Sequence, residues 1–358
     1  MIYAYKYLTY KIVNYHSKIG YFFSQLFLHD PKDYDENLLL EPDFVPVVNA
    51  SPERLRGNLE KICKAYHSLK KSEKLKVQQA FSKNNQIETL CGDIAEVPVR
   101  YDDLNKDFKK LLKDFYKMLW EEYPQNKNVS DDFGTVQEHF TAFTTKSHQT
   151  IRVCPFCGLN KMKPSGSINH NAYDHYLPQR YYPFIGIQFN NLFPACHECN
   201  SDEKKDVDTL YDGKTRRLVF YPYDTSYDPD QLNVAINPKH LYSVVDFKTL
   251  LDSIEWEFDI TLAGAIDERI KTWDSVFKIK RRFRENMLYY EDTWFEELMN
   301  RYRSEIAKGT GFNEFKREIL ADAKYLVRVS PLGILKYSYY NFLFSDGDFE
   351  MKLSELTD

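Results

Sequence analysis

The chain has 358 residues, enough for a full hydrophobic core and for more than one structural region. Its formal net charge of −5, from 48 basic and 53 acidic residues, excludes a protein whose whole surface is basic and wraps nucleic acid. There is no secretory signal and no apolar run long enough to span a bilayer, so we expect a cytoplasmic protein without a membrane partner. Of the six cysteines, Cys63 and Cys91 stand alone in helical context, and we expect them to be ordinary buried thiols.

The first part of the chain, residues 1–149, is predicted to be mostly helical and to serve either as core or as a docking region for a partner. Residues 30–50 contain several prolines and are predicted to form an irregular connector. A helix is expected to begin after Ser51, with Pro52 in its first turn. The clearest helix covers residues 102–122, because apolar residues form one stripe against a charged face. Core packing explains this stripe, and a partner surface is the alternative.

Two Cys-x-x-Cys pairs, Cys154/Cys157 and Cys196/Cys199, mark the next region. Each pair offers two sulfur atoms on one tight turn, so the four thiolates together can close a tetrahedral structural zinc site. A site with four cysteine ligands has no open coordination position, and we therefore expect this zinc to be structural. His197 could replace one cysteine, but the spacing favours the four cysteines.

A carboxylate, an imidazole and carboxamides lie between and beside the two pairs. The motifs follow in the order Cys-x-x-Cys, Asp174-His175-x-x-Pro, Asn191-Leu, Cys-x-x-Cys-Asn200, all within 47 residues. Each short motif alone occurs often by chance, and the specificity lies in the order. An imidazole has a pKa suited to activating water near pH 7, and carboxylate and carboxamide oxygens suit a hard divalent cation. The pattern therefore favours metal-assisted hydrolysis.

This order of motifs resembles that of the HNH endonucleases, the ββα-metal nuclease superfamily, in the version braced by a zinc knuckle. The resemblance implies a β-hairpin followed by a helix, with Asp174 and Asn200 as ligands of a catalytic Mg²⁺ or Mn²⁺ ion. It implies that His175 is the general base and that Asn191 orients the loop bearing His175 through backbone hydrogen bonds. The implied reaction is hydrolysis of phosphodiester bonds in nucleic acid, with DNA favoured over RNA.

Basic residues near these motifs are candidate phosphate contacts. Arg180 could clamp a phosphate in bidentate fashion, and a solvated loop arginine is an equal alternative. Many relatives have a lysine three residues after the helix asparagine, where this chain has Glu203. Either Lys204 makes that phosphate contact instead, or the contact is absent. The densest basic cluster, residues 278–284, is predicted to be a solvated helix face, with DNA backbone contact as the alternative.

The last part of the chain, residues 211–358, is predicted to contain short strands at 214–221 and 256–262 and then helices from residue 266 onward. The expected fold class is α+β and mainly helical. A central zinc-braced HNH module at residues 150–210 is flanked by helical regions on both sides.

The resemblance to HNH endonucleases is strong over about 60 residues and weak in the flanks. With a helical region before the module and a helical tail after it, the chain looks similar to the HNH subunit of Septu-type anti-phage systems. This implies an ABC-type ATPase as partner and a role as the nuclease component of a bacterial defence complex. A stand-alone restriction-like nuclease is one alternative, but no helix-turn-helix or second DNA-binding motif is apparent, which favours partner dependence. A non-catalytic zinc adaptor or DNA-binding subunit is the other alternative. That adaptor would keep the four cysteines and tolerate the loss of Asp174 or His175.

Overall fold

The computed structural model describes residues 1–121, 126–238 and 255–356. Its N-terminal region is helical. Ser51 caps the helical segment after it by accepting the Leu55 N–H, as its position before a proline predicts. The helix predicted at residues 102–122 corresponds to α7 (Lys106–Glu121), which begins four residues later than predicted, and residue 122 lies outside the described residues. The buried side of α7 packs into the N-terminal core, which confirms the core explanation. The elements are α1 (Val13–His29), α2 (Glu36–Leu39), α3 (Val45–Asn49), η1 (Pro52–Arg56), α4 (Gly57–His67), α5 (Lys71–Asn84), α6 (Ile87–Gly92), η2 (Tyr101–Asp103), α7 (Lys106–Glu121), α8 (Lys127–Phe133) and α9 (Val136–Phe143).

The connector predicted at residues 30–50 is not wholly irregular, because it contains the short helices α2 and α3. The Asp35 carboxylate caps α2 by accepting the Asn37 N–H. Apolar residues of both helices are buried against the N-terminal core. Local capping and tertiary burial therefore override the proline signal.

Small antiparallel sheets and short helices make up the middle of the molecule. Strand β1 (Tyr173–His175) pairs with β2 (Leu192–Pro194), so that Asp174 lies opposite Phe193 and His175 lies opposite Leu192. The other elements are η4 (Phe189–Asn191) before β2, the π-helical segment η5 (Glu198–Lys204) after it, and the two-residue strands β3 (Tyr211–Asp212) and β4 (Thr215–Arg216). The strand predicted at 214–221 is thus only two residues long.

The C-terminal region begins with a two-stranded sheet and continues as helices, as predicted from residue 266 onward. Helices α13 and α14 pack closely against each other, and Gly333 is the first residue of α14. A Cβ atom added at Gly333 would collide with the Leu326 carbonyl group of α13. The elements are η6 (Pro229–Gln231), β5 (Leu232–Ile236), β6 (Phe258–Leu262), α11 (Glu268–Phe277), α12 (Ile279–Ala307), α13 (Phe312–Val329), α14 (Gly333–Ser345) and α15 (Phe349–Glu355).

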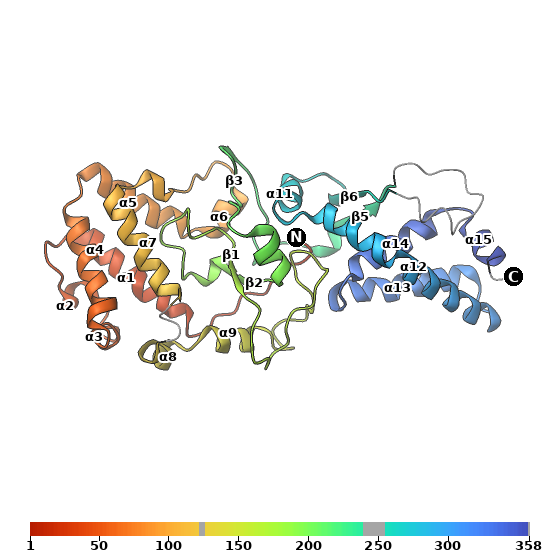
Figure 1. The fold of residues 1–358 in the computed structure, drawn as a ribbon, viewed down its shortest axis with the longest axis horizontal. Coiled ribbons are helices and arrows are strands. Elements are labelled where there is room, and N and C mark those ends of the chain that lie inside the picture. The colour runs from red at the N-terminus through yellow and green to blue at the C-terminus, as the bar shows by residue number, and fades with distance from the viewer. Residues whose placement is uncertain (122–125, 239–254, 357–358) are drawn as a thin grey trace.

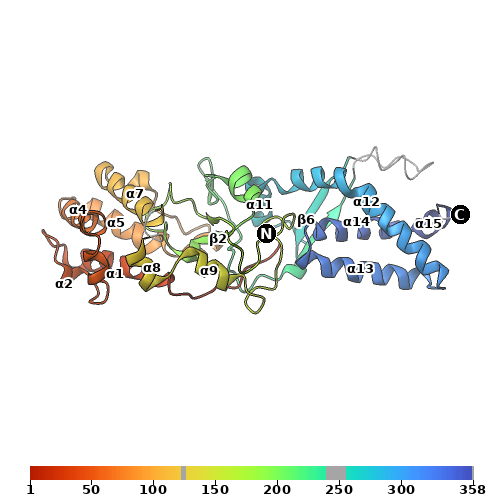
Figure 2. The same cartoon turned by 60° about the horizontal axis from the view of Figure 1, so that its bottom comes forward.

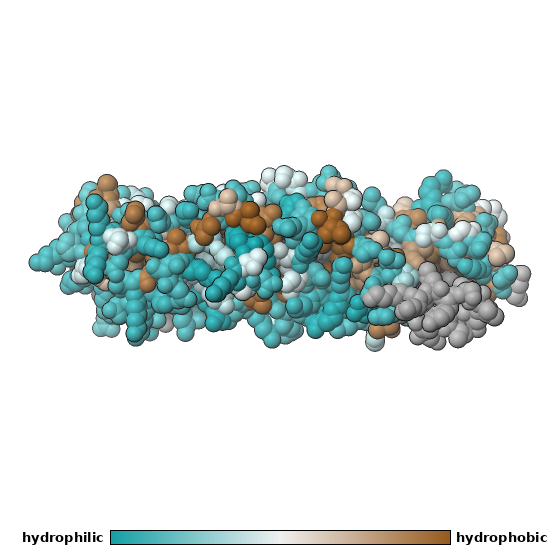
Figure 3. Space-filling view, turned by 90° about the horizontal axis from the view of Figure 1, so that it is seen from above, coloured by the Kyte–Doolittle hydropathy of each residue, from teal (hydrophilic) through white to brown (hydrophobic). Residues whose placement is uncertain are grey.

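The molecule is elongated, with the N-terminal helices at one end, the C-terminal helices at the other and the small sheets between them (Figure 1). The view in Figure 2 shows the same arrangement, with α12, α13 and α14 running along the long axis. Hydrophilic residues cover most of the face in Figure 3, and hydrophobic ones form small separate groups. The fold is mixed α+β and mostly helical, as predicted. Within the described ranges, no helix combines the length and the apolar character that a membrane crossing requires.

Two large hydrophobic clusters divide the core, and the segment 150–210 contributes to both. Phe184 and Ile187, between β1 and β2, belong to the N-terminal cluster. Leu177 and Phe193 belong to the other cluster, together with the four cysteines of the Cys-x-x-Cys pairs and the C-terminal helices. The β1–β2 hairpin is therefore fixed from both ends of the molecule.

The first five residues lie inside this second cluster. The Ile2 N–H donates to the Pro155 carbonyl at 2.7 Å, and the Tyr5 N–H donates to the Pro222 carbonyl at 2.7 Å. The Tyr5 hydroxyl donates to the Pro194 carbonyl at 2.6 Å, and the Tyr227 hydroxyl donates to the Met1 carbonyl at 2.5 Å. The N-terminal segment thus joins the middle of the molecule to the turn that precedes β5.

The buried His139 on α9 should make the folded protein less stable in acid. Its side chain is buried beside the Tyr173 hydroxyl, 2.5 Å from Nδ1, and burial lowers its pKa from 6.5 to about 4, although a hydrogen bond with the Leu8 backbone opposes the shift. Because the folded-state pKa is lowered, the stabilisation is complete above pH 6.5 and is lost as the pH falls towards 4. Between pH 7 and pH 5 the free energy of unfolding should fall by about 2 kcal/mol through this residue.

Urea unfolding of the wild type and of His139→Gln at both pH values measures this contribution. The variant should lose about 2 kcal/mol less than the wild type over the same interval, because glutamine does not titrate. An equal loss in both proteins would show that His139 is not responsible.

Candidate functional site

The four cysteines of the Cys-x-x-Cys pairs form one buried cluster. Their Sγ atoms all lie within 4.8 Å of one another, and all six cysteines of the chain are free thiols. The Sγ atoms of Cys157 and Cys196 are 3.9 Å apart. Tetrahedral zinc with Zn–S bonds of about 2.3 Å would separate its sulfur ligands by about 3.8 Å. The cluster therefore has the size of a structural zinc site, as the spacing predicts.

Backbone geometry points the sulfur atoms inward. The turn after the first cysteine closes through a hydrogen bond from the Gly158 N–H to the Cys154 carbonyl at 2.7 Å, and Gly158 adopts a φ of 68°. The Leu159 N–H donates to Cys157 Sγ, and the Cys199 N–H donates to Cys196 Sγ, both at 3.4 Å. Such N–H donors stabilise negative charge on sulfur.

His197 is not part of the cluster. Its side chain is 82% exposed, and its Nδ1 lies 3.5 Å from the Asp202 carboxylate. The expectation that the cysteines rather than His197 form the ligand set therefore agrees with the geometry.

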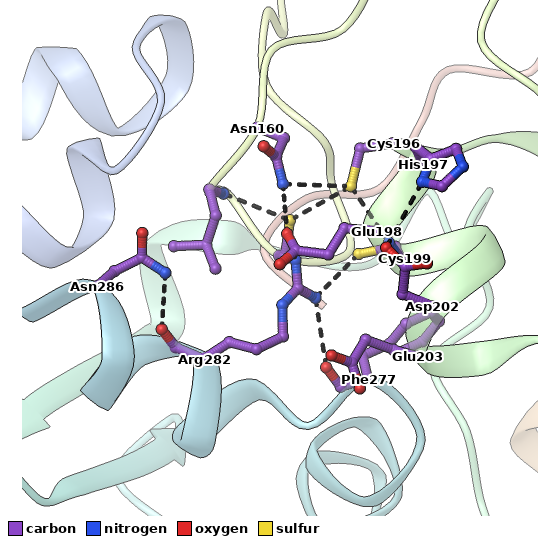
Figure 4. A network of polar contacts seen from close by, with 12 residues as sticks. Asn160, Cys196, His197, Glu198, Cys199, Asp202, Glu203, Phe277, Arg282 and Asn286 are labelled. Atoms are coloured by element: carbon purple, nitrogen blue, oxygen red, sulfur yellow. Dashed lines mark hydrogen bonds and ion pairs between the residues drawn. The ribbon is translucent and has the colours of Figure 1, made fainter.

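Arg282 on α12 lies directly against the sulfur cluster (Figure 4). Its guanidinium Nη1 donates to Cys199 Sγ at 3.2 Å, Nη2 pairs with the Glu198 carboxylate, and the side chain is 1% exposed. Burial alone would lower the pKa of Arg282, but the sulfur atoms of Cys199 and Cys157 and the Glu198 carboxylate raise it overall. A buried cation in this position favours negative charge on the sulfur atoms, which is the state of metal-bound thiolates. Zinc with four thiolates has a net charge of about −2, and Arg282 offsets part of it.

The basic cluster at residues 278–284 is thus not a simple solvated face. Arg282 serves the sulfur cluster, Arg281 pairs with the Glu203 carboxylate, and the Arg284 Nε donates to the Trp256 carbonyl at 2.9 Å. The run of charges in the sequence could not show this, because helical spacing directs neighbouring residues to different surroundings.

Asn191 forms hydrogen bonds with the backbone that follows His175. Its Oδ1 accepts the Leu177 N–H at 2.8 Å, and its Nδ2 donates to the Leu177 carbonyl at 2.9 Å. Its own carbonyl accepts the Tyr176 N–H at 2.9 Å. The side chain is fully buried, so these bonds are shielded from water. The segment after His175 is therefore held rigidly to the start of β2.

His175 has one ring nitrogen engaged. Its Nε2 lies 2.8 Å from the Gly186 carbonyl oxygen. A carbonyl oxygen can accept a hydrogen bond but cannot donate one, so the ring proton belongs on Nε2. The half-buried ring also packs edge-on against Trp120, with the ring centroids 4.9 Å apart. Burial lowers the pKa of His175 to about 4, although the Gly186 hydrogen bond opposes the shift, and the Lys204 charge lowers it further. The imidazole is therefore neutral at pH 7, with Nδ1 as its basic atom and no hydrogen-bond partner for Nδ1 among the described residues.

Asp174 is buried and paired with Lys204. The Lys204 Nζ donates to Asp174 Oδ1 at 2.9 Å and to the His175 carbonyl at 2.8 Å, and the lysine side chain is 0% exposed. Asp174 Oδ2 is buried without a hydrogen-bond partner in the part of the chain that the structure describes. Burial raises the pKa of the Asp174 carboxyl group, and the Lys204 charge opposes this shift. One carboxylate oxygen is thus bonded to a cation, and the other has no partner among the described residues.

Lys204 differs from the predicted phosphate contact, because its ammonium group is buried and bonded inside the protein. Its position four residues after Asn200 in η5 directs it back towards β1. Arg180 is exposed, as expected of either role, and its Nη1 pairs with Asp206 at 2.7 Å. The Asn200 side chain is half-buried and makes no hydrogen bond to another described residue. Asp174, His175, Asn191 and Asn200 thus share one hairpin and the helical segment after it.

Sequence reasoning missed the groups that surround these side chains. Trp120 and Gly186 contact His175, and Arg282 contacts the sulfur cluster. Trp120 and Arg282 are far from the motifs in the chain, so only tertiary structure brings them there. The pairing of Lys204 with Asp174 had a weak signal, since Lys204 follows Asn200 at helical spacing.

Substitution of one cysteine should release the metal. Structural zinc contributes about 10–16 kcal/mol in small domains, which is comparable to the whole stability of a typical domain. Cys154→Ser should therefore lose bound zinc and unfold the segment around the cluster, as measured by elemental analysis and thermal unfolding. Cys63→Ser changes a buried thiol outside the cluster and should keep one zinc ion per chain. Equal zinc content in both variants would contradict a zinc site at the four cysteines.

No protein-family model, curated protein or solved structure matches the chain. The functional argument therefore depends on the residues of the site and on their geometry.

Proposed function

We propose that this protein is a metal-dependent endonuclease of the HNH type that hydrolyses phosphodiester bonds, with DNA as substrate. The observation that carries the proposal is the state of His175, a neutral imidazole whose Nε2 proton is held by a main-chain carbonyl group. The Nδ1 atom is left as a base on a strand that also holds the buried Asp174 carboxylate. A neutral, oriented imidazole beside a possible cation site is the arrangement that water activation needs.

In the proposed reaction, His175 Nδ1 accepts the proton of the attacking water. The Gly186 carbonyl keeps the imidazole in the required tautomer, and Trp120 restricts the orientation of the ring. Asn191 holds the backbone on the far side of His175, so that the base cannot shift relative to β2. General base catalysis of this kind contributes about 10²–10⁴-fold to a rate.

Asp174 and Asn200 are the proposed ligands of Mg²⁺ or Mn²⁺. The unpaired, buried Oδ2 of Asp174 and the unbonded carboxamide of Asn200 are oxygen donors of the kind that a hard cation prefers. When bound, the ion supplies charge stabilisation for the phosphate and for the leaving 3′ oxygen. Asp174 would donate through Oδ2, because Lys204 holds Oδ1.

The same Lys204 favours a second candidate function. An ammonium group that neutralises Asp174 from within makes a second cation less necessary there. A non-catalytic zinc adaptor or DNA-binding subunit would keep the sulfur cluster and use Lys204 and Asp174 as a structural ion pair. The two functions differ in whether Asp174 binds a divalent ion and whether His175 affects cleavage.

Replacement of His175 tests the nuclease directly. His175→Ala should reduce nicking of supercoiled plasmid by about 10²-fold or more in the presence of Mg²⁺ or Mn²⁺, because it removes the proposed base. His197→Ala is the matched control, since His197 lies in the same region but is 82% exposed and outside the sulfur cluster. Both variants should keep their zinc. Equal cleavage by wild type and His175→Ala would contradict the proposed mechanism.

Replacement of Lys204 separates the two candidates. Lys204→Met leaves the Asp174 carboxylate buried and uncompensated, which should destabilise the protein by about 3–5 kcal/mol. If Asp174 is a metal ligand, Mn²⁺ should raise the melting temperature of the variant more than that of the wild type, because the ion replaces the lost cation. The double variant Asp174→Asn/Lys204→Met should recover stability and show no response to Mn²⁺. A Mn²⁺ response equal in all three proteins would favour the adaptor.

A role in anti-phage defence beside an ABC-type ATPase is part of the same proposal. It is supported by the helical regions on both sides of the central module and by the net charge of −5, which favours electrostatic help from a partner. Cleavage that appears only when the ATPase is added would favour partner dependence. Cleavage by the purified chain alone would favour the stand-alone, restriction-like nuclease.

A further inference from the structure

A cavity of about 1270 Å³ lies in the C-terminal half of the molecule, apart from the residues of the proposed nuclease. Its walls are formed by strand β5 and by helices α13 and α14, of which α14 packs directly on β5. Ile2 and Tyr3 of the N-terminal segment and residues of the loop before the first Cys-x-x-Cys pair close one side. Ligand pockets usually measure about 300–1,000 Å³, so this cavity has room for more than a small metabolite.

The lining is basic in a protein whose net charge is −5. Lys146, Arg152 and Lys324 line the cavity and form no ion pair with any residue in the described ranges. Arg328 also lines it and pairs with Asp230 at 3.3 Å, the one acidic residue in the described lining. Unpaired cations that converge on a cavity attract an anion, and arginine in particular matches phosphate.

Aromatic side chains share the same walls. Tyr325 is 71% exposed, and Tyr337 and Phe342 on α14 are half-buried. Rings that line a solvent-accessible cavity are suited to stack on a planar ligand such as a nucleobase. A purely anionic ligand such as an acidic peptide would use the cations and leave the rings without a function.

Tyr3 provides an independent sign of a missing ligand. Its side chain is only 4% exposed, it lines the cavity, and its hydroxyl is buried without a hydrogen-bond partner among the described residues. A buried hydroxyl group without a partner costs stability, so such groups are rare unless a ligand or water satisfies them. The described residues do not supply that partner, which points to a ligand or water beside Tyr3.

We propose that this cavity binds nucleotide units, with phosphate on Arg152 and Lys324 and a base against Tyr337. The chemistry is shared by a free nucleotide and by a short single-stranded oligonucleotide. The site is separate from the proposed nuclease, because Asp174, His175, Asn191 and Asn200 do not line it. It is nevertheless connected to the sulfur cluster, since the Leu332 N–H before α14 donates to the Gly158 carbonyl at 3.0 Å.

The test is direct binding to the full-length, zinc-loaded protein without added Mg²⁺. The probes are fluorescein-labelled single-stranded oligodeoxythymidylate of 12 nucleotides, ATP, inorganic tripolyphosphate and an oligoglutamate peptide, each titrated at several salt concentrations. Lys324→Glu should weaken the nucleotide probes about tenfold or more and lower the salt dependence of binding. Arg317→Glu makes the same charge change on α13 outside the cavity, at a 73% exposed side chain, and should change binding less than about twofold.

Tyr337→Leu tests the aromatic contribution. It should weaken the base-bearing probes about fivefold or more and leave tripolyphosphate unchanged, because only the former can stack. Tighter binding of the oligonucleotide than of ATP would identify a strand as the ligand, and the reverse would identify a free nucleotide.

Three results would overturn the proposal: no binding of either nucleotide probe, equal weakening by Lys324→Glu and Arg317→Glu, or preference for oligoglutamate. None of these results bears on His175-dependent cleavage, so failure of this site and failure of the nuclease are distinguishable.

Discussion

The neutralisation of four buried sulfur atoms is the constraint on which the middle of the structure depends. Four cysteines within 4.8 Å of one another can be thiolates in a dry interior only if cations balance them. A metal ion at the centre would supply most of that balance, and the Arg282 guanidinium at the edge contributes to it. Arg282 comes from α12, more than eighty residues beyond the second cysteine pair. The charge on the sulfur atoms therefore ties the central hairpin to the C-terminal helices.

A second buried negative charge, on β1 of the hairpin, is balanced in the same way. Asp174 is buried and balanced by Lys204 from η5, as the sulfur atoms are balanced by Arg282. Both η5 and the second cysteine pair follow β2 directly, so one short segment delivers ligands to the sulfur cluster and a cation to β1. In the proposed nuclease, the structural metal would thus set the distance between the helix and the strand that hold the catalytic groups.

The sequence predicts the cysteine cluster of this region better than it predicts the residues that pack around the cluster. Cysteine spacing is set by local turn geometry, so the cluster of Cys154, Cys157, Cys196 and Cys199 could be predicted without a structure. The helical stripe of α7 was predictable for the same reason, because periodicity is local. The use of Arg282 could not be predicted, and that of Lys204 had only a weak signal, since a charged residue on a helix has the same sequence signature whether it faces water or a buried partner. The N-terminal region shows a further limit of the sequence, because α2 and α3 form where the prolines predicted an irregular connector.

The position of the N-terminal segment has a consequence for the order of folding. Residues 1–5 lie in the core, yet their hydrogen-bond partners are in residues 155, 194, 222 and 227. A ribosome that adds about 5–20 residues per second needs ten seconds or more to reach the last of these partners. During that interval the N-terminal helices can form most of their own cluster, whereas the first five residues still lack the hydrogen-bond partners at residues 222 and 227. Residues 1–5 are therefore among the last of the described residues to reach their native position.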